Sequence, residues 1–230
     1  MLRLAIITAR GGSKRIPKKN IRNFLGKPII SYSITEALGS GLFDEVMVST
    51  DSEEIAGIAG KFGAKIPFMR STENSDDHSD TADVLREVLS AYEKAGCVFE
   101  EFCCIYPTAP FITAEKLIES HKLLSDSVWN VVPMVPFSFP PQRGMVLRDG
   151  FMKPLDPVSI EMRSQDLETV YHDAGQFYWC KTERFLENKS VLSEYTVPFI
   201  VSELEVQDID NETDWKLAEL KYRLMREEHA

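Results

Sequence analysis

The chain has 230 residues, of which 43% are hydrophobic and 27% charged, and its formal net charge is −10. This composition predicts one well-buried core and excludes an intrinsically disordered protein. No apolar run approaches the roughly 20 residues that cross a bilayer, and no cleavable signal pattern precedes the first predicted strand, so we expect a cytoplasmic protein without a membrane partner. The four cysteines lack CxxC spacing and are expected to be reduced structural thiols.

Strand and helix signals alternate along the first part of the chain. In chain order the sequence predicts strand 2–9, helix 28–41, strand 45–50, helix 52–63, a brief extended piece over 65–69, helix 80–95, strand 102–106, helix 114–126 and strand 129–135. This β-α-β-α order predicts a three-layer α/β/α sandwich around a mostly parallel, doubly wound, Rossmann-like sheet. A single domain over residues 1–230 is the expectation. Ligands bind beyond the carboxyl ends of such strands, so the loops after Thr8, Thr50 and Tyr106 should meet at one rim.

The alternation is interrupted between about residues 136 and 172. Prolines punctuate short extended pieces there, and the segment "GMVLRDGFMKPL" predicts a β-hairpin. Long insertions in compact domains tend to serve binding or assembly, and we expect one of these roles here. The regular pattern returns with predicted strands 175–180 and 196–206 and a final helix over 212–230.

A basic loop follows the first predicted strand. It reads "ARGGSKRIPKKN" over residues 9–20 and concentrates cations in an acidic chain. The patterns GxxxxGK[ST] and GxGxxG are both missing, but Gly11 and Gly12 can bring backbone N–H groups close to an anion. Several cation–phosphate contacts suit a triphosphate, whereas a pI of 5.0 without an extended basic stripe argues against nucleic acid. The alternative for this loop is a solvated surface turn.

Two aspartates, Asp208 and Asp210, stand two positions apart in the acidic segment "EVQDIDNETD" near the C-terminus, and they are called the acidic pair here. If the preceding strand continues over 205–210, Asp208 and Asp210 project from the same face, because side chains alternate along a strand. Their repulsion is relieved by a divalent cation, and Mg²⁺ combines one or two carboxylates with phosphate oxygens, so the pair predicts a Mg²⁺ site. The alternative is that Asp210 only caps the final helix or makes a turn.

Four segments together resemble one family. They are "IITARGGSKRIPKKN", "FDEVMVSTDSEEIAGIAGKFGAKIPFMR", "YPTAPF" and "DIDNETD". As a set they are similar to the sugar-acid cytidylyltransferases, the group that includes CMP-sialic acid synthetases, and "RSQDLETVYHDAGQFYW" most resembles the pseudaminic acid members. The resemblance implies a fold of the nucleotide-diphospho-sugar transferase type. It also implies transfer from CTP to the anomeric hydroxyl of an acidic nine-carbon sugar, namely pseudaminic acid or alternatively sialic or legionaminic acid. A non-catalytic nucleotide-binding module is the alternative from another class.

The resemblance also implies roles for individual residues. The expected nucleotide-binding residues are Ala9, Arg10, Gly11, Gly12, Lys14, Lys19, Asn20, Arg70, Asp80 and Thr81. The expected catalytic residues are Arg10, Lys19 and Asp210, and the expected Mg²⁺ ligands are Asp208 and Asp210. A plain helix N-cap is the alternative for Asp80. Sialic-acid members resemble one another in placing a glutamine where this chain has Tyr106, which leaves the sugar contacts over 107–109 open.

The insertion is expected to contact the sugar. The candidates for its carboxylate and acetamido groups are Gln142, Arg143, Arg163, Ser164, Gln165, Asp166 and His172. The alternative for each arginine is an ordinary surface or interface ion pair. No nucleophile at recognisable spacing accompanies His172 and Asp173, which favours a sugar-pocket or structural role over a catalytic dyad. The resemblance further implies a homodimer in which the insertion reaches the partner, and a lid over its own subunit is the alternative.

Overall fold

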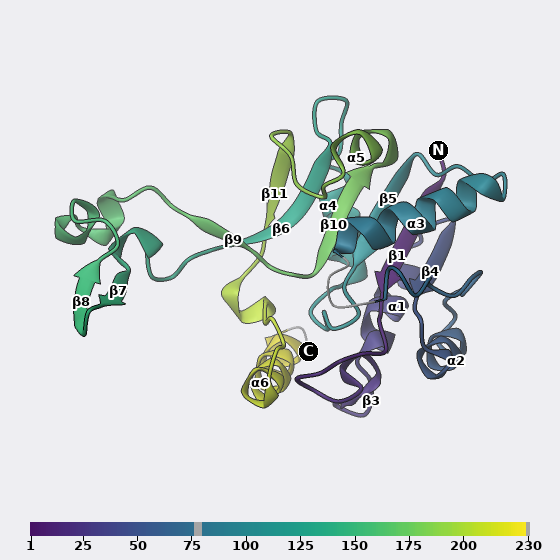
Figure 1. The fold of residues 1–230 in the computed structure, drawn as a ribbon, viewed down its shortest axis with the longest axis horizontal. Coiled ribbons are helices and arrows are strands. Elements are labelled where there is room, and N and C mark those ends of the chain that lie inside the picture. Colours follow the sequence, from purple (N-terminus) through teal and green to yellow (C-terminus); the bar gives the residue numbers. More distant parts are fainter. Residues whose placement is uncertain (76–79, 229–230) are drawn as a thin grey trace.

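The computed structural model describes residues 1–75 and 80–228. One mixed sheet has the strand order β11-β6-β10-β5-β1-β4, with β9 paired to β6 (Figure 1). Its strands are β1 (Arg3–Thr8), β4 (Glu45–Ser49), β5 (Glu101–Ile105), β6 (Asn130–Pro136), β9 (Tyr171–Asp173), β10 (Phe177–Lys181) and β11 (Thr196–Ile200). The pairings make β4, β1, β5, β6 and β11 run in one direction, and only β10 and β9 in this sheet run against them. The predicted α/β fold with a mostly parallel sheet is confirmed, with the antiparallel strand β10 between β5 and β6.

Helices cover both faces of this sheet. The α-helices of the described residues are α1 (Ile30–Gly39), α2 (Glu53–Lys61), α3 (Thr81–Lys94), α4 (Ala114–His121), α5 (Thr182–Asn188) and α6 (Glu212–Glu228), and the first five cover the sheet. Apolar residues of α1, α2 and α4 pack on one face of the sheet, and those of α3 and α5 pack on the other. The three layers are therefore those expected from the sequence. None of the helices in the described part of the chain combines the length and the apolar composition that a bilayer crossing requires.

Strands β1 and β5 show why the sheet lies between two layers of helices. Successive side chains of a strand point to opposite faces, so Ile6 and Ile7 enter different clusters, and both are fully buried. Cys103 and Cys104 divide between the same two clusters, and all four cysteines are free thiols, as expected from their spacing. A strand that is apolar on both faces is stable only between two layers of helices.

Side-chain caps set the starts of three helices. Ser52, Asp80 and Thr113 each accept a hydrogen bond from the backbone N–H three residues further on, at the starts of α2, α3 and α4. Each cap satisfies a backbone donor that has no partner inside its helix. The alternative for Asp80 is thus correct in part, because this residue is a helix cap.

The helix predicted over 114–126 is shorter in the structure. It ends at His121, and the next residues form tight turns in which Leu123 and Leu124 donate to carbonyls three residues back. Ser125 then pairs with Val128. The turns are needed because the chain must reverse at once to enter β6.

The strand predicted over 196–206 is also shorter, and its predicted continuation to residue 210 is wrong. Strand β11 ends at Ile200, and the Ser202 hydroxyl accepts a hydrogen bond of 3.3 Å from the Leu204 N–H. This local bond turns the chain into a short 3-10 helix, η5 (Glu203–Glu205), and ends the ladder.

Helix α6 packs beside a small hairpin of β2 (Asn23–Phe24) and β3 (Lys27–Pro28). The ring of Phe24 lies edge-on to Trp215 and Tyr222 at centroid distances of 5.6 and 5.7 Å. Ile16 from the basic loop and Ile209 from the segment before α6 are buried in the same cluster. Burial of these two side chains therefore brings the basic loop and the acidic pair to one place.

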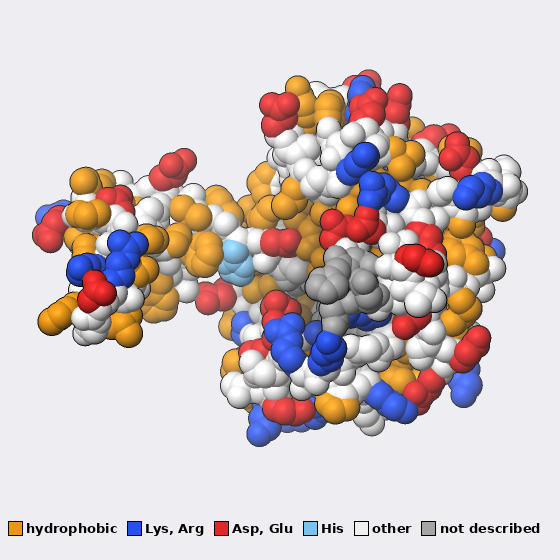
Figure 2. All heavy atoms as spheres, in the orientation of Figure 1, with side chains coloured by type: hydrophobic (Ala, Val, Ile, Leu, Met, Phe, Trp, Pro, Cys, Tyr) orange, Lys and Arg blue, Asp and Glu red, His pale blue; other side chains and the backbone are white. Residues whose placement is uncertain are grey.

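Residues 136–172, here called the arm, project from the rest of the fold (Figure 1). The arm carries the predicted hairpin, formed by β7 (Met145–Arg148) and β8 (Phe151–Pro154). Its two turn residues, Asp149 and Gly150, have φ of 53° and 81°, the backbone that an Asp-Gly hairpin turn adopts. Figure 2 shows hydrophobic side chains gathered on the arm, and Phe139 and Phe151 are 86% and 71% exposed.

Candidate active site

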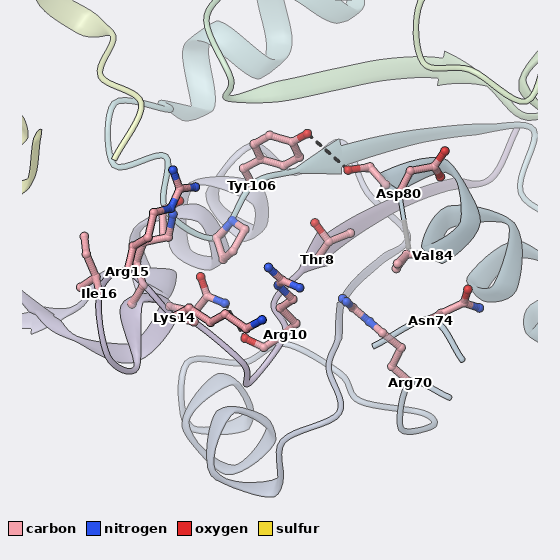
Figure 3. A pocket seen from close by; sticks show the side chains of 16 residues that line it. Thr8, Arg10, Lys14, Arg15, Ile16, Arg70, Asn74, Asp80, Val84 and Tyr106 are labelled. Atoms are coloured by element: carbon pink, nitrogen blue, oxygen red, sulfur yellow. Dashed lines mark hydrogen bonds between the residues drawn. The ribbon is translucent and has the colours of Figure 1, made fainter. Parts of the chain in front are cut away.

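A cavity of about 330 Å³ lies at the carboxyl ends of β1 and β5. It is lined by Thr8, Arg10, Ser13, Lys14, Arg15, Ile16, Lys19, Asn20, Arg70, Asn74, Asp80, Thr81, Val84, Tyr106, Pro107 and Thr108. Figure 3 shows the head groups of Arg10, Lys14 and Arg70 turned toward the same space beside Thr8. The predicted rim therefore exists, and most of the expected nucleotide-binding side chains meet there.

The start of the basic loop is held by polar contacts to its own fold. The buried Asn20 side chain donates a hydrogen bond of 2.9 Å to the Arg10 carbonyl, and the Gly11 N–H donates one of 2.7 Å to the Asp51 carboxylate. A Cβ on Gly11 would approach that of Ser52 to 3.1 Å, which is tighter than most side-chain contacts, so glycine fits this position best. This N–H is therefore directed at Asp51, which corrects the expected anion contact at Gly11. Ala9, Gly11 and Gly12 are not in the cavity lining described above.

Lys19 and Arg15 join the basic loop to the acidic pair. The Lys19 ammonium donates a hydrogen bond of 2.7 Å to the Ile209 carbonyl and lies 3.9 Å from the Asp210 carboxylate. The Arg15 guanidinium lies 2.7 Å from the same carboxylate. Burial lowers the pKa of Lys19, and the charges of Asp210 and Asp208 act in the opposite direction. The two regions singled out in the sequence thus form one mixed-charge cluster.

Asp208 and Asp210 lie in an extended segment outside any strand. Ile209 between them is buried, whereas Asp208 is exposed and Asp210 is half-buried. Burial and the charge of Asp210 raise the pKa of Asp208. The repulsion expected between the two carboxylates is therefore present, although the predicted strand is not.

The cap of the last helix is Asn211 rather than Asp210. The Asn211 side chain accepts hydrogen bonds from the backbone N–H groups of Thr213 and Asp214, and the Asp214 carboxylate accepts from those of Asp210 and Asn211. This is a reciprocal capping box. The capping alternative for Asp210 is wrong, and its carboxylate faces Arg15 and Lys19.

The acidic pair fits Mg²⁺ only as a partial site. Among residues 1–75 and 80–228 no group of three or more His, Cys, Asp or Glu side chains has a metal-binding arrangement. The two carboxylates supply anionic oxygens, and burial together with the charge of Asp210 raises the pKa of Asp208. The remaining ligands would come from substrate and water. Mg²⁺ is commonly bound in this way.

Arg70 is fixed by strand β4. Its Nε donates a hydrogen bond of 3.0 Å to the Ser49 hydroxyl, and its Nη2 donates one of 2.6 Å to the Ser49 carbonyl. Only 8% of the residue is exposed, and burial lowers the pKa of Arg70. A guanidinium stays charged in proteins nonetheless, so Arg70 presents a rigid positive group to the cavity.

The start of α3 forms the opposite wall. Asp80 lines the cavity while it caps the helix, and the Thr81 hydroxyl lies 3.4 Å from the Tyr106 hydroxyl. Burial raises the pKa of Tyr106, whose ring is tilted against Tyr178 at 5.3 Å. This wall is neutral and donor-rich on the Thr81 and Tyr106 side, in contrast with the cationic loop.

The arm holds the expected sugar residues away from this cavity. Among the described residues, the cavity lining includes none of Gln142, Arg143, Arg163, Ser164, Gln165, Asp166 and His172. Gln142 instead donates to the Glu168 carbonyl at 2.8 Å, and the His172 ring packs on Phe137. Within one chain the structure therefore does not bring the sugar candidates to the nucleotide candidates.

His172 and Asp173 form no dyad. The His172 Nδ1 lies 3.0 Å from the Asp173 backbone carbonyl, while the Asp173 carboxylate accepts hydrogen bonds from the Tyr178 hydroxyl and the Gly175 N–H. The bond from Tyr178 is 2.6 Å long. A structural role for Asp173, where the arm returns to the sheet, follows from these contacts.

Comparisons with known proteins identify the family of the chain. The sequence profile described as Cytidylyltransferase matches residues 4–218.

The chain belongs to the cytidylyltransferase family.

Over 99% of both chains it is 38% identical to the pseudaminic acid cytidylyltransferase of Campylobacter jejuni. It is 34% identical, over 97% of both chains, to the CMP-N,N'-diacetyllegionaminic acid synthase of Legionella pneumophila. The solved structure of CMP:2-keto-3-deoxy-manno-octonic acid synthetase complexed with CTP matches 99% of this chain and 100% of its own, with a TM-score of 0.69 and 18% identity, which shows a common fold.

Lys18 of the basic loop and Arg22, just beyond it, lie outside the cavity of this cytidylyltransferase. Lys18 pairs with the Glu54 carboxylate at 2.7 Å, and Arg22 pairs with Glu212 while its guanidinium lies 4.5 Å from the Trp215 ring centroid. Both side chains form ion pairs at the surface, which fits the alternative of a solvated surface turn for this part of the chain. Arg15 is the third cation without an expected role, and it lines the cavity.

Sequence reasoning missed several residues of the cavity wall. Ser13 and Arg15 belong to the basic loop, and Asn74 follows Arg70 by four residues in an irregular polar segment. The loop's position could have signalled the first two. Asn74 has no motif of its own, because only the packing of its segment against α3 places it at the wall.

Proposed function

We propose that the protein transfers a cytidylyl group from CTP to the anomeric hydroxyl of a nonulosonic acid, most readily pseudaminic acid. Legionaminic and sialic acids are the alternative acceptors. The observation that carries the reaction is the meeting of Arg10, Lys14 and Arg70 in one cavity beside the acidic pair. The full-length similarity to a pseudaminic acid cytidylyltransferase supports the choice of sugar.

In this reaction the acceptor oxygen forms a bond to the α-phosphorus of CTP while the bond from that phosphorus to the bridging oxygen breaks. Pyrophosphate leaves with the electron pair of the broken bond, and the hydroxyl proton passes to a base or to water. Arg10, Lys14 and Lys19 would hold the phosphates and balance the charge that develops on them. Catalysis of this kind depends mainly on positioning and electrostatics.

Asp208 and Asp210 would hold Mg²⁺ against the phosphates of the bound nucleotide. The ion would supply charge stabilisation, and Asp210 would also be placed to accept the proton of the attacking hydroxyl. Arg15 and Lys19 contact the Asp210 carboxylate, so their positive charges would lie beside the bound metal and the phosphates. The raised pKa of Asp208 supports a site that gains from a bound cation.

The arm would complete the sugar site in a homodimer. The exposed aromatic side chains at Phe139 and Phe151 need a cover, and the sugar candidates lie on the same arm. Contact with a partner's cavity would meet both needs. The free cysteines support a cytoplasmic location, where thiols are kept reduced.

A coupled assay of pyrophosphate release with CTP and a panel of nonulosonic acids tests the reaction. Turnover is expected to be fastest with pseudaminic acid. Faster turnover of sialic acid would overturn the choice of sugar, and no pyrophosphate from any sugar acid would overturn the reaction.

Asp210→Ala separates this reaction from simple nucleotide binding. Turnover should be abolished at every Mg²⁺ concentration, while most of the affinity for CTP should remain, because the cationic side chains are intact. Glu212→Gln is the matched control, since Glu212 is an exposed carboxylate of the same region that pairs with Arg22. Undiminished turnover of Asp210→Ala would favour another base and metal ligand, and CTP binding without turnover by the wild type would favour a non-catalytic module.

A further inference from the structure

Glu87, on α3, receives three hydrogen bonds from the segment that follows Arg70. Its carboxylate accepts from the Ser71 N–H at 2.8 Å, from the Ser71 hydroxyl at 3.1 Å and from the Asn74 side-chain amide at 2.5 Å. None of these residues was singled out in the sequence. The carboxylate thus joins a rigid helix to two positions of an irregular segment.

This irregular segment carries two parts of the cavity wall. Arg70 and Asn74 both line the cavity (Figure 3), and in the sequence they precede and follow Ser71. The described residues 70–75 include no helix or strand, so no regular ladder of backbone bonds sets their shape. Segments of this kind are ordered by side-chain to backbone bonds, and removal of such a bond frees the backbone.

The contacts also set the direction of the Asn74 amide. A carboxylate only accepts hydrogen bonds, so the amide nitrogen of Asn74 must face Glu87. The amide oxygen is then the atom available to a ligand in the cavity. The negative charge of Glu87 also acts on Arg70 and favours its charged form.

We propose that Glu87 is a positioning residue for nucleotide binding, which holds Asn74 and the backbone that follows Arg70 in the geometry that receives CTP. The inference rests on the proposed function only in taking CTP as the ligand of the cavity. Glu87 itself is not in the cavity lining and acts through the segment that it anchors. Loss of its contacts should therefore weaken nucleotide binding more than it slows the chemical step.

Glu87→Gln tests this role with little change in shape. The glutamine keeps one acceptor oxygen for Ser71, but its amide would face the donor amide of Asn74. The KM for CTP is expected to rise about tenfold, the effect of losing one charge-assisted hydrogen bond, while kcat at saturating CTP changes by less than about threefold. Glu93→Gln is the control, because Glu93 is an exposed carboxylate of the same helix, and it should leave both constants unchanged.

An exchange of partners distinguishes positioning from a general structural role. Asn74→Asp alone places two carboxylates together and should weaken CTP binding further than Glu87→Gln. The double variant Glu87→Gln with Asn74→Asp restores a donor facing an acceptor, and it should recover most of the CTP affinity. Failure of the double variant to bind CTP better than Asn74→Asp would overturn the proposal, as would a KM for CTP within twofold of the wild type in Glu87→Gln.

Calorimetric titration with CTP alone separates this inference from the proposed reaction. If the wild type binds CTP but releases pyrophosphate with no sugar acid, the reaction fails while the titration of the variants still decides the role of Glu87. If the wild type does not bind CTP, the positioning role is overturned as well. Equal melting temperatures of the wild type and Glu87→Gln would show that the loss of affinity does not come from unfolding.

Discussion

The cavity rim and the arm arrange their charged side chains in opposite ways. At the rim, residues far apart in the chain converge, so that Lys19 contacts the Ile209 carbonyl across 190 positions of sequence. On the arm, the candidates lie within one insertion, yet they remain away from the cavity of their own chain. The sheet and its helix layers force the rim together, whereas a thin hairpin has no second layer against which to pack.

The residues expected to bind the nucleotide are therefore brought together by the folding of one chain, whereas those expected to bind the sugar are not. In a single chain, most of the side chains expected to bind the nucleotide already line one cavity. On the function proposed above, the sugar half would need a further association or movement that brings the arm to a cavity. The predictions below test that division, beginning with the largest expected effect.

Lys19→Gln should lower kcat/KM by about 10²–10³-fold, because the ammonium is removed from the point where the phosphates and the acidic pair meet. Lys18→Gln is the control from the neighbouring position. Lys18 forms only a surface pair with Glu54 and should change kcat/KM by less than about twofold. Steady-state pyrophosphate release measures both, and equal losses in the two variants would contradict the division between cavity and surface lysines.

Arg163→Ala should raise the KM for the sugar about tenfold and leave the KM for CTP unchanged, because the arm is expected to bind the acceptor's carboxylate. Mixing this variant with Lys19→Gln tests whether the arm acts on a partner. Randomly mixed dimers would then regain roughly a quarter of the wild-type sites. No recovery would mean that each arm serves its own cavity, or that Arg163 forms only a surface ion pair.

Alkaline pH should weaken CTP binding by several-fold in the wild type, because burial lowers the pKa of Lys19 below its ordinary value of 10.5. A lysine with a lowered pKa loses its charge at a lower pH than an exposed lysine, and the contact with phosphate is lost with it. Lys19→Arg should keep its affinity to higher pH, since guanidinium stays charged. Titrations with CTP between about pH 7 and 10 measure the effect, and parallel pH profiles of the two proteins would contradict it.

Replacing Leu147 and Phe151 with serine should have the smallest effect on the single chain. Both side chains are 71% exposed at the hairpin, so the free energy of unfolding should change by less than about 0.5 kcal/mol. Sedimentation should nonetheless show weaker self-association if the arm forms the dimer contact. Val98→Ser, an exposed apolar side chain of the main body, is the control and should affect neither quantity.

Much of the fold could be predicted because its determinants are local. The apolar run of β1 has to be buried on both faces. The Asp149–Gly150 turn closes a hairpin, and the side chain of Asp80 caps the helix that follows it. The family was predicted from four segments and is confirmed by the match over residues 4–218. The predicted ends of α4 and β11 were wrong because local hydrogen bonds turn the chain directly after each element.

The sequence by itself determined the layers, the basic loop and the presence of an acidic pair, because hydrophobic periodicity and charge are properties of neighbouring residues. Tertiary structure alone decided that Asp210 meets Arg15 and Lys19, and that Glu87 anchors the wall that carries Asn74. The physical reason is burial. Ile16 and Ile209 come from opposite ends of the chain and fill one aromatic cluster, and the charged groups beside them are carried into contact by packing that no local pattern encodes.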